Sequence, residues 1–175
     1  MQIKGILFDF DGTIANTIDL IIATFEHTCR EVLGFTPERE KIVATFGLPL
    51  PEAMIALSGK PELVETMRDA YREYNNAHHD NMIRPIPGVK ETLEQLKAHG
   101  IKLAVVTSKK LPMLRRGLDC LQLTPYFDAT VALSDTKESK PHPEPMLAAC
   151  AKLGVKPEEC LCVGDSPFDL QSGRS

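Results

Sequence analysis

Tryptophan is absent from the 175-residue chain, and phenylalanine and tyrosine bring the aromatic share to only 6%. Basic residues do not dominate either, since 20 lysines and arginines stand against 24 aspartates and glutamates, a formal net charge of −4. We therefore expect no nucleic-acid partner, because phosphate-backbone binding usually requires a basic patch. No apolar run approaches the roughly 20 residues that a membrane-spanning helix needs, so we expect no membrane partner.

The cysteines show no disulfide framework. Their number is odd, and each lies inside an apolar segment: Cys29, Cys120, Cys150, Cys160 and Cys162. We interpret them as reduced, buried, small side chains of a cytoplasmic protein. The first residues, MQIKGILFDFDG, soon become acidic, so they do not predict a secretory signal peptide. The length is typical of one domain, or of one domain with a smaller insert.

Short apolar runs that alternate with helical patterns predict the fold class. The runs are Ile3–Phe8, Leu103–Val106, Ala129–Leu133 and Leu161–Val163, and each is typical of a strand buried on both faces. A helical pattern precedes each of the last three, and Gly100 and Gly154 are placed to end two of these helices. Such alternation predicts an α/β fold, with a doubly wound parallel sheet covered on both sides.

The stretch from Thr13 to Ile86 breaks this alternation, because it shows helical patterns and no convincing strand. Apolar residues at helical spacing predict a helix over 18–33, which Gly34 ends. Shorter helices are expected around 42–46 and 53–57, and a longer one over 63–74, before the proline-rich segment 84–88. We predict an α/β core of residues 1–14 and 86–175, with a helical insert of residues 15–85.

The predicted fourth strand is followed only by the start of a helix at Ser166 or Pro167 before the sequence stops. The pattern therefore looks cut short, with the last strand of the sheet missing. The fourth strand would then form an unprotected edge of the sheet. We expect a chain extended at its C-terminus to be more stable and more active than the 175-residue form.

Polar side chains follow the predicted strands at the points where these strands end. Ligands of open parallel sheets bind in the crevice beyond these carboxyl ends. The side chains are Asp9 and Asp11 after the first strand, Thr107 and Ser108 after the second, Lys140 after the third, and Asp165 and Asp169 after the fourth. Carboxylates, hydroxyls and a lysine at one edge predict a site for a phosphate group and a cation.

The acidic residues favour a divalent cation. Asp9 and Asp11 lie two residues apart, so an extended backbone directs both side chains to one side. Carboxylates that close cannot both stay ionised easily unless a cation intervenes or one holds a proton. Mg²⁺ prefers oxygen ligands, typically one or two carboxylates with substrate phosphate, and Asp9 and Asp165 supply such a pair.

The remaining residues suit a phosphate group. Gly12 lets the chain turn tightly, and Thr13 adds a hydroxyl near the anion. Thr107 can donate a hydrogen bond to a phosphate oxygen. Lys140 would offset the charge of a transferring phosphoryl group as a compact point charge.

The segment Asp9-Phe-Asp11-Gly-Thr13 resembles the first motif of the haloacid dehalogenase superfamily, whose phosphatases begin DxDGT. Thr107, Lys140 and the segment 164–169 resemble its second, third and fourth motifs in the right order, so the resemblance covers essentially the whole chain. It implies a Rossmann-like core with a helical cap at residues 15–85. Segment 46–50 resembles the cap's specificity loop in phosphoglycolate phosphatases, and segment 74–80 resembles a stretch of the bacterial pyrophosphatase branch.

The resemblance also implies a mechanism for small phosphate esters or anhydrides, such as phosphoglycolate or pyrophosphate. Asp9 would attack phosphorus and form an aspartyl-phosphate, while Asp11 would act as general acid and then as general base. Mg²⁺ would be bound by the carboxylates of Asp9 and Asp165 and by the backbone carbonyl of Asp11. The other implied roles are phosphoryl binding by Thr107 and the Ser108 amide, charge neutralisation by Lys140, and orientation of Lys140 or a metal-bound water by Asp169.

Simpler interpretations and other functions remain open at this point. Asp169 could simply cap its helix, and His78-His79-Asp80 favours a solvated helix end over a metal site. A phosphosugar mutase of the same superfamily is the alternative enzyme. Two alternatives belong to other classes of protein. One is a receiver-like phosphate-binding domain, which would place its acceptor aspartate after the third strand, and the other is a non-catalytic relic. No pattern points to an oligomeric state.

Overall fold

The computed structural model describes residues 2–174. Its contacts divide the chain into two compact units, Met1–Asn16 with Arg84–Ser175, and Thr17–Ile83. The predicted insert spans residues 15–85. The observed division assigns residues 15–16 and 84–85, at the two ends of the predicted insert, to the first unit. These residues pair with one another as short β-strands.

The first unit contains a four-stranded parallel sheet with the strand order β5-β4-β1-β6. The strands are β1 (Gly5–Phe8), β4 (Lys102–Val106), β5 (Ala129–Val131) and β6 (Cys160–Val163). Ile6 of β1 lies opposite Leu103 on one side and Leu161 on the other. The predicted α/β class with a doubly wound parallel sheet is therefore confirmed.

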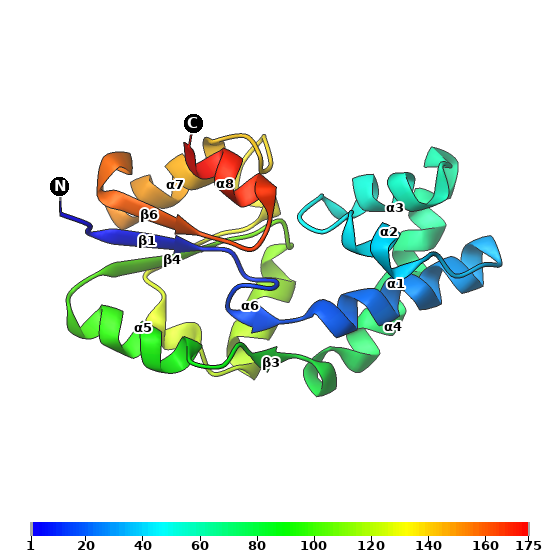
Figure 1. Cartoon of the computed structure of the whole chain (residues 1–175), viewed down its shortest axis with the longest axis horizontal. Coiled ribbons are helices and arrows are strands. Elements are labelled where there is room, and N and C mark those ends of the chain that lie inside the picture. Colours follow the sequence, from blue (N-terminus) through cyan, green and yellow to red (C-terminus); the bar gives the residue numbers. More distant parts are fainter. Residues whose placement is uncertain (1, 175) are drawn as a thin grey trace. The chain divides into compact units, whose positions relative to one another are not determined.

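Helices cover both faces of this sheet (Figure 1). On one face lie α5 (Val89–Ala98) and α6 (Leu111–Cys120), and on the other α7 (Glu144–Leu153) and α8 (Pro167–Arg174). Short 3-10 helices connect these elements: η2 (Thr124–Tyr126), η3 (Leu133–Asp135) and η4 (Pro157–Glu159).

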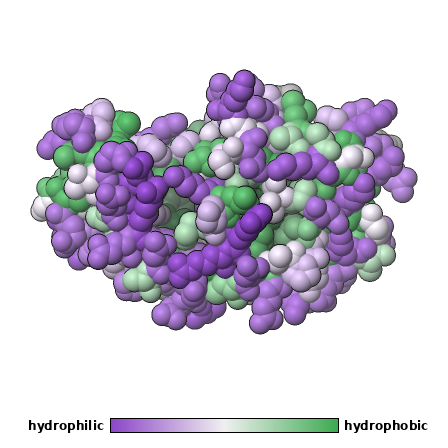
Figure 2. Space-filling view, turned by 180° about the vertical axis from the view of Figure 1, so that it is seen from behind, coloured by the Kyte–Doolittle hydropathy of each residue, from purple (hydrophilic) through white to green (hydrophobic). Residues whose placement is uncertain are grey.

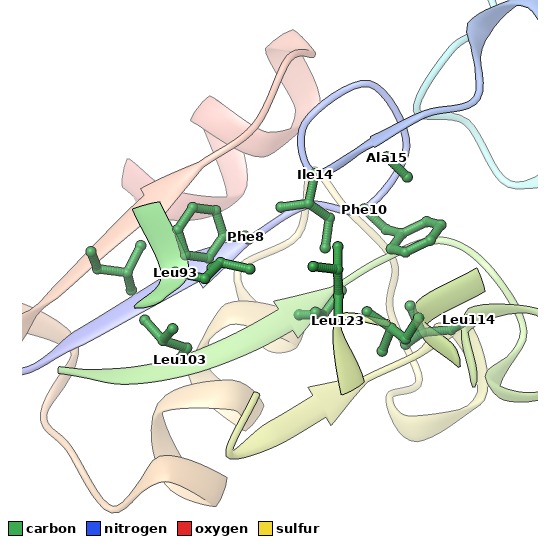
Figure 3. Close-up of a cluster of buried hydrophobic side chains, with 11 residues drawn as sticks. Phe8, Phe10, Ile14, Ala15, Leu93, Leu103, Leu114 and Leu123 are labelled. Carbon is green, nitrogen blue, oxygen red and sulfur yellow. The ribbon is translucent and has the colours of Figure 1, made fainter. Parts of the chain in front are cut away.

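The core between the sheet and the α5–α6 face contains Phe8, Phe10, Leu103 and Leu114 (Figure 3). Phe10 is fully buried although it lies between two acidic residues. Successive residues of an extended segment point to opposite sides, so the aromatic ring enters the core while the two carboxylates point away from it. This ring anchors the acidic segment to the core.

The sequence predictions differ from the structure in two strands. β6 is not buried on both faces, because it is an edge strand whose Leu161 and Val163 side chains are 50% and 41% exposed. The expectation of no strand between Thr13 and Ile86 is also wrong, because β2 (Ala15–Asn16) pairs antiparallel with β3 (Arg84–Pro85). Two-residue strands are too short to leave an alternating pattern in a sequence.

The second unit is helical. It contains α1 (Ile18–Leu33), α2 (Arg39–Val43), α3 (Leu50–Ser58), η1 (Pro61–Leu63) and α4 (Val64–Met82). Phe25 and Cys29 of α1 pack with Met54 and Met67 in a core of its own. α4 ends at Met82, just before the predicted break at Arg84, and His79 lies in its last turn. The expectation of a solvated helix end is wrong for His79, whose side chain is buried, whereas the neighbouring Asp80 is exposed.

No helix within residues 2–174 is long and apolar enough to cross a membrane. Hydrophilic side chains cover most of the face seen in Figure 2, and apolar ones lie scattered among them. All five cysteines are free thiols. The expectation that all five are buried is wrong for three of them, because Cys160 and Cys162 are only partly buried and Cys120 is exposed. It is the last residue of α6 and faces solvent.

The contact between Gly117 and Phe10 yields a prediction. A Cβ atom at Gly117 would lie 2.5 Å from Cζ of the buried Phe10 ring. We expect Gly117→Ala to destabilise the fold by about 1 to 2 kcal/mol, because crowding outweighs the higher helix propensity of alanine. Thermal unfolding measures this, as a fall in Tm of about 2–4 °C per kcal/mol.

The matched control is Phe10→Leu, alone and combined with Gly117→Ala. The second substitution should cost less in the Phe10→Leu background, because the smaller side chain leaves room for the new methyl group. An unchanged or raised Tm in Gly117→Ala alone would contradict the proposed contact.

Candidate active site

The first acidic residue of the site is held by backbone contacts at the end of β1. The Asp9 amide donates a 2.8 Å hydrogen bond to the carbonyl of Val163 in β6. The chain then turns, and the Gly12 amide donates to the carbonyl of Ala15 at 2.8 Å. Gly12 has a φ of +81°, and a Cβ atom there would overlap the carboxylate of Asp165. Glycine is thus required both for the turn and for the approach of Asp165.

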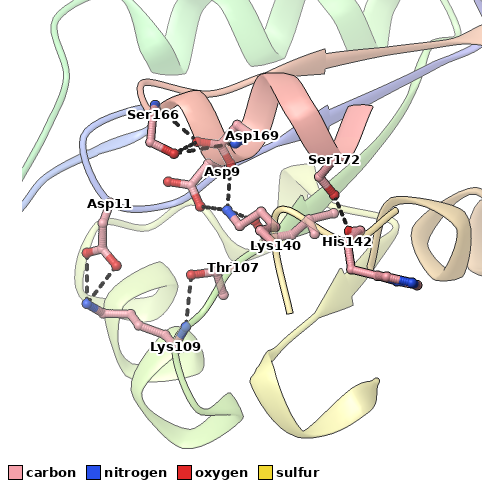
Figure 4. A network of polar contacts seen from close by, with 10 residues as sticks. Asp9, Asp11, Thr107, Lys109, Lys140, His142, Ser166, Asp169 and Ser172 are labelled. Atoms are coloured by element: carbon pink, nitrogen blue, oxygen red, sulfur yellow. Dashed lines mark hydrogen bonds and ion pairs between the residues drawn. The ribbon is translucent and has the colours of Figure 1, made fainter. Parts of the chain in front are cut away.

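Lys140 joins the loops that follow three different strands (Figure 4). Its Nζ donates hydrogen bonds of 2.6 Å to Asp9 Oδ1, 2.6 Å to Asp169 Oδ1 and 3.3 Å to the carbonyl of Val106. These three acceptors use the three N–H donors of the ammonium group. The residues Asp9, Lys140 and Asp169, predicted from distant parts of the sequence, therefore lie in direct contact.

Asp169 contacts two residues, Lys140 and Ser166. It was predicted either to orient Lys140 or to cap its helix, and these contacts do both. One oxygen accepts from Lys140, while Oδ2 accepts from the Ser166 amide at 3.1 Å and from the Ser166 hydroxyl at 2.6 Å. It thus caps the N-terminus of α8 and also holds the lysine. Two positioning residues were missed from the sequence: Ser166, and Ser172, whose hydroxyl donates to the His142 carbonyl at 2.6 Å. The Ser-x-x-Asp spacing of a capping box could have indicated Ser166.

Asp9, Asp165 and Asp169 form an acidic cluster, with one carboxylate oxygen of each within 4.8 Å of the others. Burial raises the pKa of Asp9 to about 7; Lys140 opposes this rise, and the charges of Asp169 and Asp11 add to it. Burial also raises the pKa of Asp165, and Asp169 and Asp11 contribute again. Asp9, Asp165 and Asp169 are therefore difficult to ionise at the same time, because within residues 2–174 Lys140 is the cation that offsets the charges of Asp9 and Asp165.

The donor set of the acidic cluster fits a divalent cation. Three carboxylates and one ammonium group carry a formal charge of −2, which is the charge that a divalent ion neutralises. The pKa of Lys140 is raised, since the charges of Asp9 and Asp169 outweigh the effect of burial, so the lysine stays charged. Carboxylate oxygens are ligands that Mg²⁺ prefers.

Asp11 lies beside this cluster rather than in it. Both of its oxygens accept hydrogen bonds from Lys109 Nζ at 2.8 Å. The predicted part of Asp11 in metal binding uses its backbone carbonyl, so the side chain is not needed in the cluster. Lys109 was not identified from the sequence, where two adjacent lysines resemble an ordinary exposed loop.

Three of the four predicted phosphate-binding residues line a small pocket, and Thr13 is not among them. The lining of the pocket includes Thr107, Ser108 and Lys140, together with Ala132, Leu133, Thr136, Ser139 and Pro145. The Thr107 hydroxyl accepts a 3.2 Å hydrogen bond from the Lys109 amide. The Thr13 hydroxyl oxygen is buried and has no hydrogen-bond partner within residues 2–174. A buried donor without a partner is rare, and the phosphate oxygen predicted as its ligand would satisfy it.

Several solved structures share this fold. A crystal structure described as a predicted phosphoglycolate phosphatase from Haemophilus somnus matches 99% of this chain and 82% of its own, with a TM-score of 0.89 and 27% identity. CbbY from Rhodobacter sphaeroides, solved in complex with phosphate, matches 99% of this chain and 82% of its own, with a TM-score of 0.83 and 27% identity. The fold and the acidic site thus define a hydrolase with a Rossmann-like core.

Residues 6–175 match the family of haloacid dehalogenase-like hydrolases, and the chain belongs to this family. Among curated proteins, the pyrophosphatase PpaX of Halalkalibacterium halodurans is 41% identical over the whole chain, which spans 80% of that relative. The resemblance inferred from the four motifs is confirmed, and with it the expectation of an enzyme of the hydrolase class. The receiver-like and non-catalytic alternatives are not supported.

The acidic cluster predicts stabilisation by Mg²⁺. If Mg²⁺ binds the folded protein alone, a concentration 100-fold above its Kd adds about 2.7 kcal/mol of stability, or about 5–10 °C in Tm. Asp165→Asn removes a carboxylate from the cluster and should reduce this shift strongly. Thermal unfolding with and without Mg²⁺ measures the difference.

Asp11→Asn is the matched control, because its carboxylate lies outside the cluster and its backbone carbonyl is retained. It should keep most of the shift caused by Mg²⁺. If Asp165→Asn responds to Mg²⁺ as the unaltered protein does, the cation binds elsewhere.

Proposed function

We propose that this hydrolase is a Mg²⁺-dependent phosphatase that cleaves small phosphate esters or anhydrides, of the phosphoglycolate or pyrophosphate type, through an aspartyl-phosphate on Asp9. The observation that carries the proposal is the buried Asp9 carboxylate, held at 2.6 Å by Lys140 beside the acidic cluster. The names of the relatives, a pyrophosphatase and a phosphoglycolate phosphatase, support the substrate class.

Asp9 is the proposed nucleophile. Its hydrogen bonds through the backbone amide and through Oδ1 fix the orientation of the carboxylate. In the first step, a bond forms between an Asp9 oxygen and phosphorus while the bond from phosphorus to the leaving oxygen breaks. Fixing the carboxylate beforehand removes much of the entropic cost of this alignment.

Asp11 is the proposed general acid and base. It gives a proton to the leaving oxygen in the first step. In the second step, it takes a proton from water as the water oxygen bonds to phosphorus and the bond to Asp9 breaks. The one residue thus returns to its starting state after each turnover.

The other predicted residues stabilise charge on the phosphoryl group. We propose that Thr13, Thr107 and the Ser108 amide donate hydrogen bonds to its oxygens, and that Lys140 offsets negative charge. Mg²⁺ would be bound by Asp9 and Asp165, with the Asp11 carbonyl, and would neutralise the carboxylates and the phosphoryl oxygens. Asp169 keeps Lys140 in place through its 2.6 Å contact.

We further propose that the helical insert is a substrate-selecting cap, as its position in the chain after the first strand implies. The described unit of residues 17–83 has its own apolar core, which suits a separate module. The proposed partner is a small phosphorylated molecule. Free cysteines are consistent with the proposed cytoplasmic setting.

Substitution of the nucleophile tests the mechanism. We expect Asp9→Asn to lower kcat by about a thousandfold or more, as the loss of a nucleophile typically does, and to abolish labelling by a ³²P-phosphoryl substrate. Asp11→Asn should lower kcat by about 10²- to 10⁴-fold, the usual contribution of a general acid or base. Steady turnover in Asp9→Asn at the unaltered rate would refute the aspartyl-phosphate.

A phosphate-release assay with Mg²⁺ tests the substrate class. We expect release from pyrophosphate or phosphoglycolate at a kcat/KM at least about tenfold above that of hexose phosphates, because the relatives carry those names. The same reactions are analysed for sugar-phosphate isomerisation. Isomerisation without phosphate release would favour the phosphosugar mutase instead.

A further inference from the structure

A second lysine, Lys109, contacts Asp11, the proposed general acid. Lys109 lies in the loop between β4 and α6, and its Nζ donates to both oxygens of Asp11 at 2.8 Å (Figure 4). Its amide donates to the Thr107 hydroxyl at 3.2 Å, and its carbonyl accepts from the Leu133 amide at 2.9 Å. The backbone of Lys109 is thus fixed on both sides, and its side chain reaches one carboxylate.

Lys109 differs from Lys140 in accessibility. The Lys140 side chain is only 4% exposed and its three donors already have acceptors, whereas Lys109 is 18% exposed and Asp11 is 24% exposed. An ammonium group has three N–H donors, and Asp11 takes two from Lys109. One donor and a partly exposed positive charge therefore remain for a group that comes close to Asp11.

The leaving group is the part of the substrate that must come close to Asp11. A general acid lies within hydrogen-bond reach of the oxygen that it protonates, so a cation bound to that acid also lies near the leaving group. Once Asp11 has given its proton to the leaving oxygen, its negative charge would face the charge of an anionic leaving group if Lys109 were absent. Lys109 neutralises Asp11 and can bind the leaving group as well.

We infer that Lys109 is the residue that selects substrates whose leaving group carries negative charge. Pyrophosphate expels phosphate, and phosphoglycolate expels glycolate with its carboxylate, whereas glycerol phosphate expels a neutral alcohol. The inference rests on the proposed function and narrows it to anionic leaving groups. Lys109 also positions Asp11, and that role affects every substrate equally.

The test compares two classes of substrate in one set of variants. In Lys109→Met, the ratio of kcat/KM for pyrophosphate to that for glycerol phosphate should fall about tenfold or more, as expected for losing one charge a few ångströms away. Lys109→Arg keeps the charge and should largely keep the ratio. Lys110→Met is the matched control, because Lys110 is the adjacent, exposed lysine.

Binding gives a second measurement that does not depend on turnover. In an Asp9→Asn background, calorimetry measures the Kd of pyrophosphate in the presence of Mg²⁺. Adding Lys109→Met should weaken this binding about tenfold or more, while adding Lys110→Met should change it less than about twofold. Lys109→Gln replaces Lys109→Met if thermal unfolding shows that the methionine variant is not folded.

The possible outcomes separate the inference from the function on which it rests. Equal losses for pyrophosphate and glycerol phosphate in Lys109→Met would show that the lysine only positions Asp11, and would overturn the inference alone. An equal effect in Lys110→Met would also overturn it, since any nearby positive charge would then suffice. If the unaltered protein released no phosphate from any substrate, the proposed function would fail, and the inference with it.

Discussion

The site depends on one buried ammonium group. Lys140 follows β5 in the chain, yet it contacts Asp9 after β1 and Asp169 after β6 at 2.6 Å each. Removing one partner from such a buried ion pair leaves an uncompensated charge, which is far more costly than replacing the pair by apolar residues. The contacts of Lys140 therefore constrain the ends of three strands at once. The sheet order makes this possible, because β1 and β6 are neighbours and place Asp9 and Asp169 together at one edge.

The arrangement leaves negative charge unneutralised in the site, at a cost to the stability of the fold. The acidic cluster keeps a formal charge of −2 even after Lys140 is counted, and burial raises the pKa of both Asp9 and Asp165. A fold selected for stability alone would not gather carboxylates in this way, because their mutual repulsion opposes folding. The excess negative charge is instead what a bound divalent cation would neutralise. Perturbed carboxyl groups at strand ends are typical of functional sites for this reason.

Much of this could be predicted from the sequence. The four core strands, the helices and the residues of the acidic cluster follow from hydrophobic patterns and from motifs at strand ends. What could not be predicted depends on tertiary contacts. Lys109 looked like an exposed loop lysine because its partner, Asp11, lies 98 positions earlier in the chain. The place of β6 at the edge of the sheet agrees with the edge expected for the fourth strand, and it explains why the apolar run is not buried on both faces. His79 lies at the end of α4 as expected, but its burial depends on which face of the helix packs against other elements.

The two lysines divide the site into two parts with different physical demands. Lys140 is buried and its three N–H donors all have acceptors, so it fixes the proposed nucleophile, Asp9, and leaves no donor for choosing among substrates. Lys109 is partly exposed and uses two of its three N–H donors on Asp11. We infer that its charge is therefore available to the leaving group. A site that must cleave one kind of bond in various substrates needs a rigid part for the common phosphoryl group and an accessible part for the variable group. Phe10 connects these parts, because its buried ring anchors the segment that carries both lysine-bound carboxylates, Asp9 and Asp11, to the core.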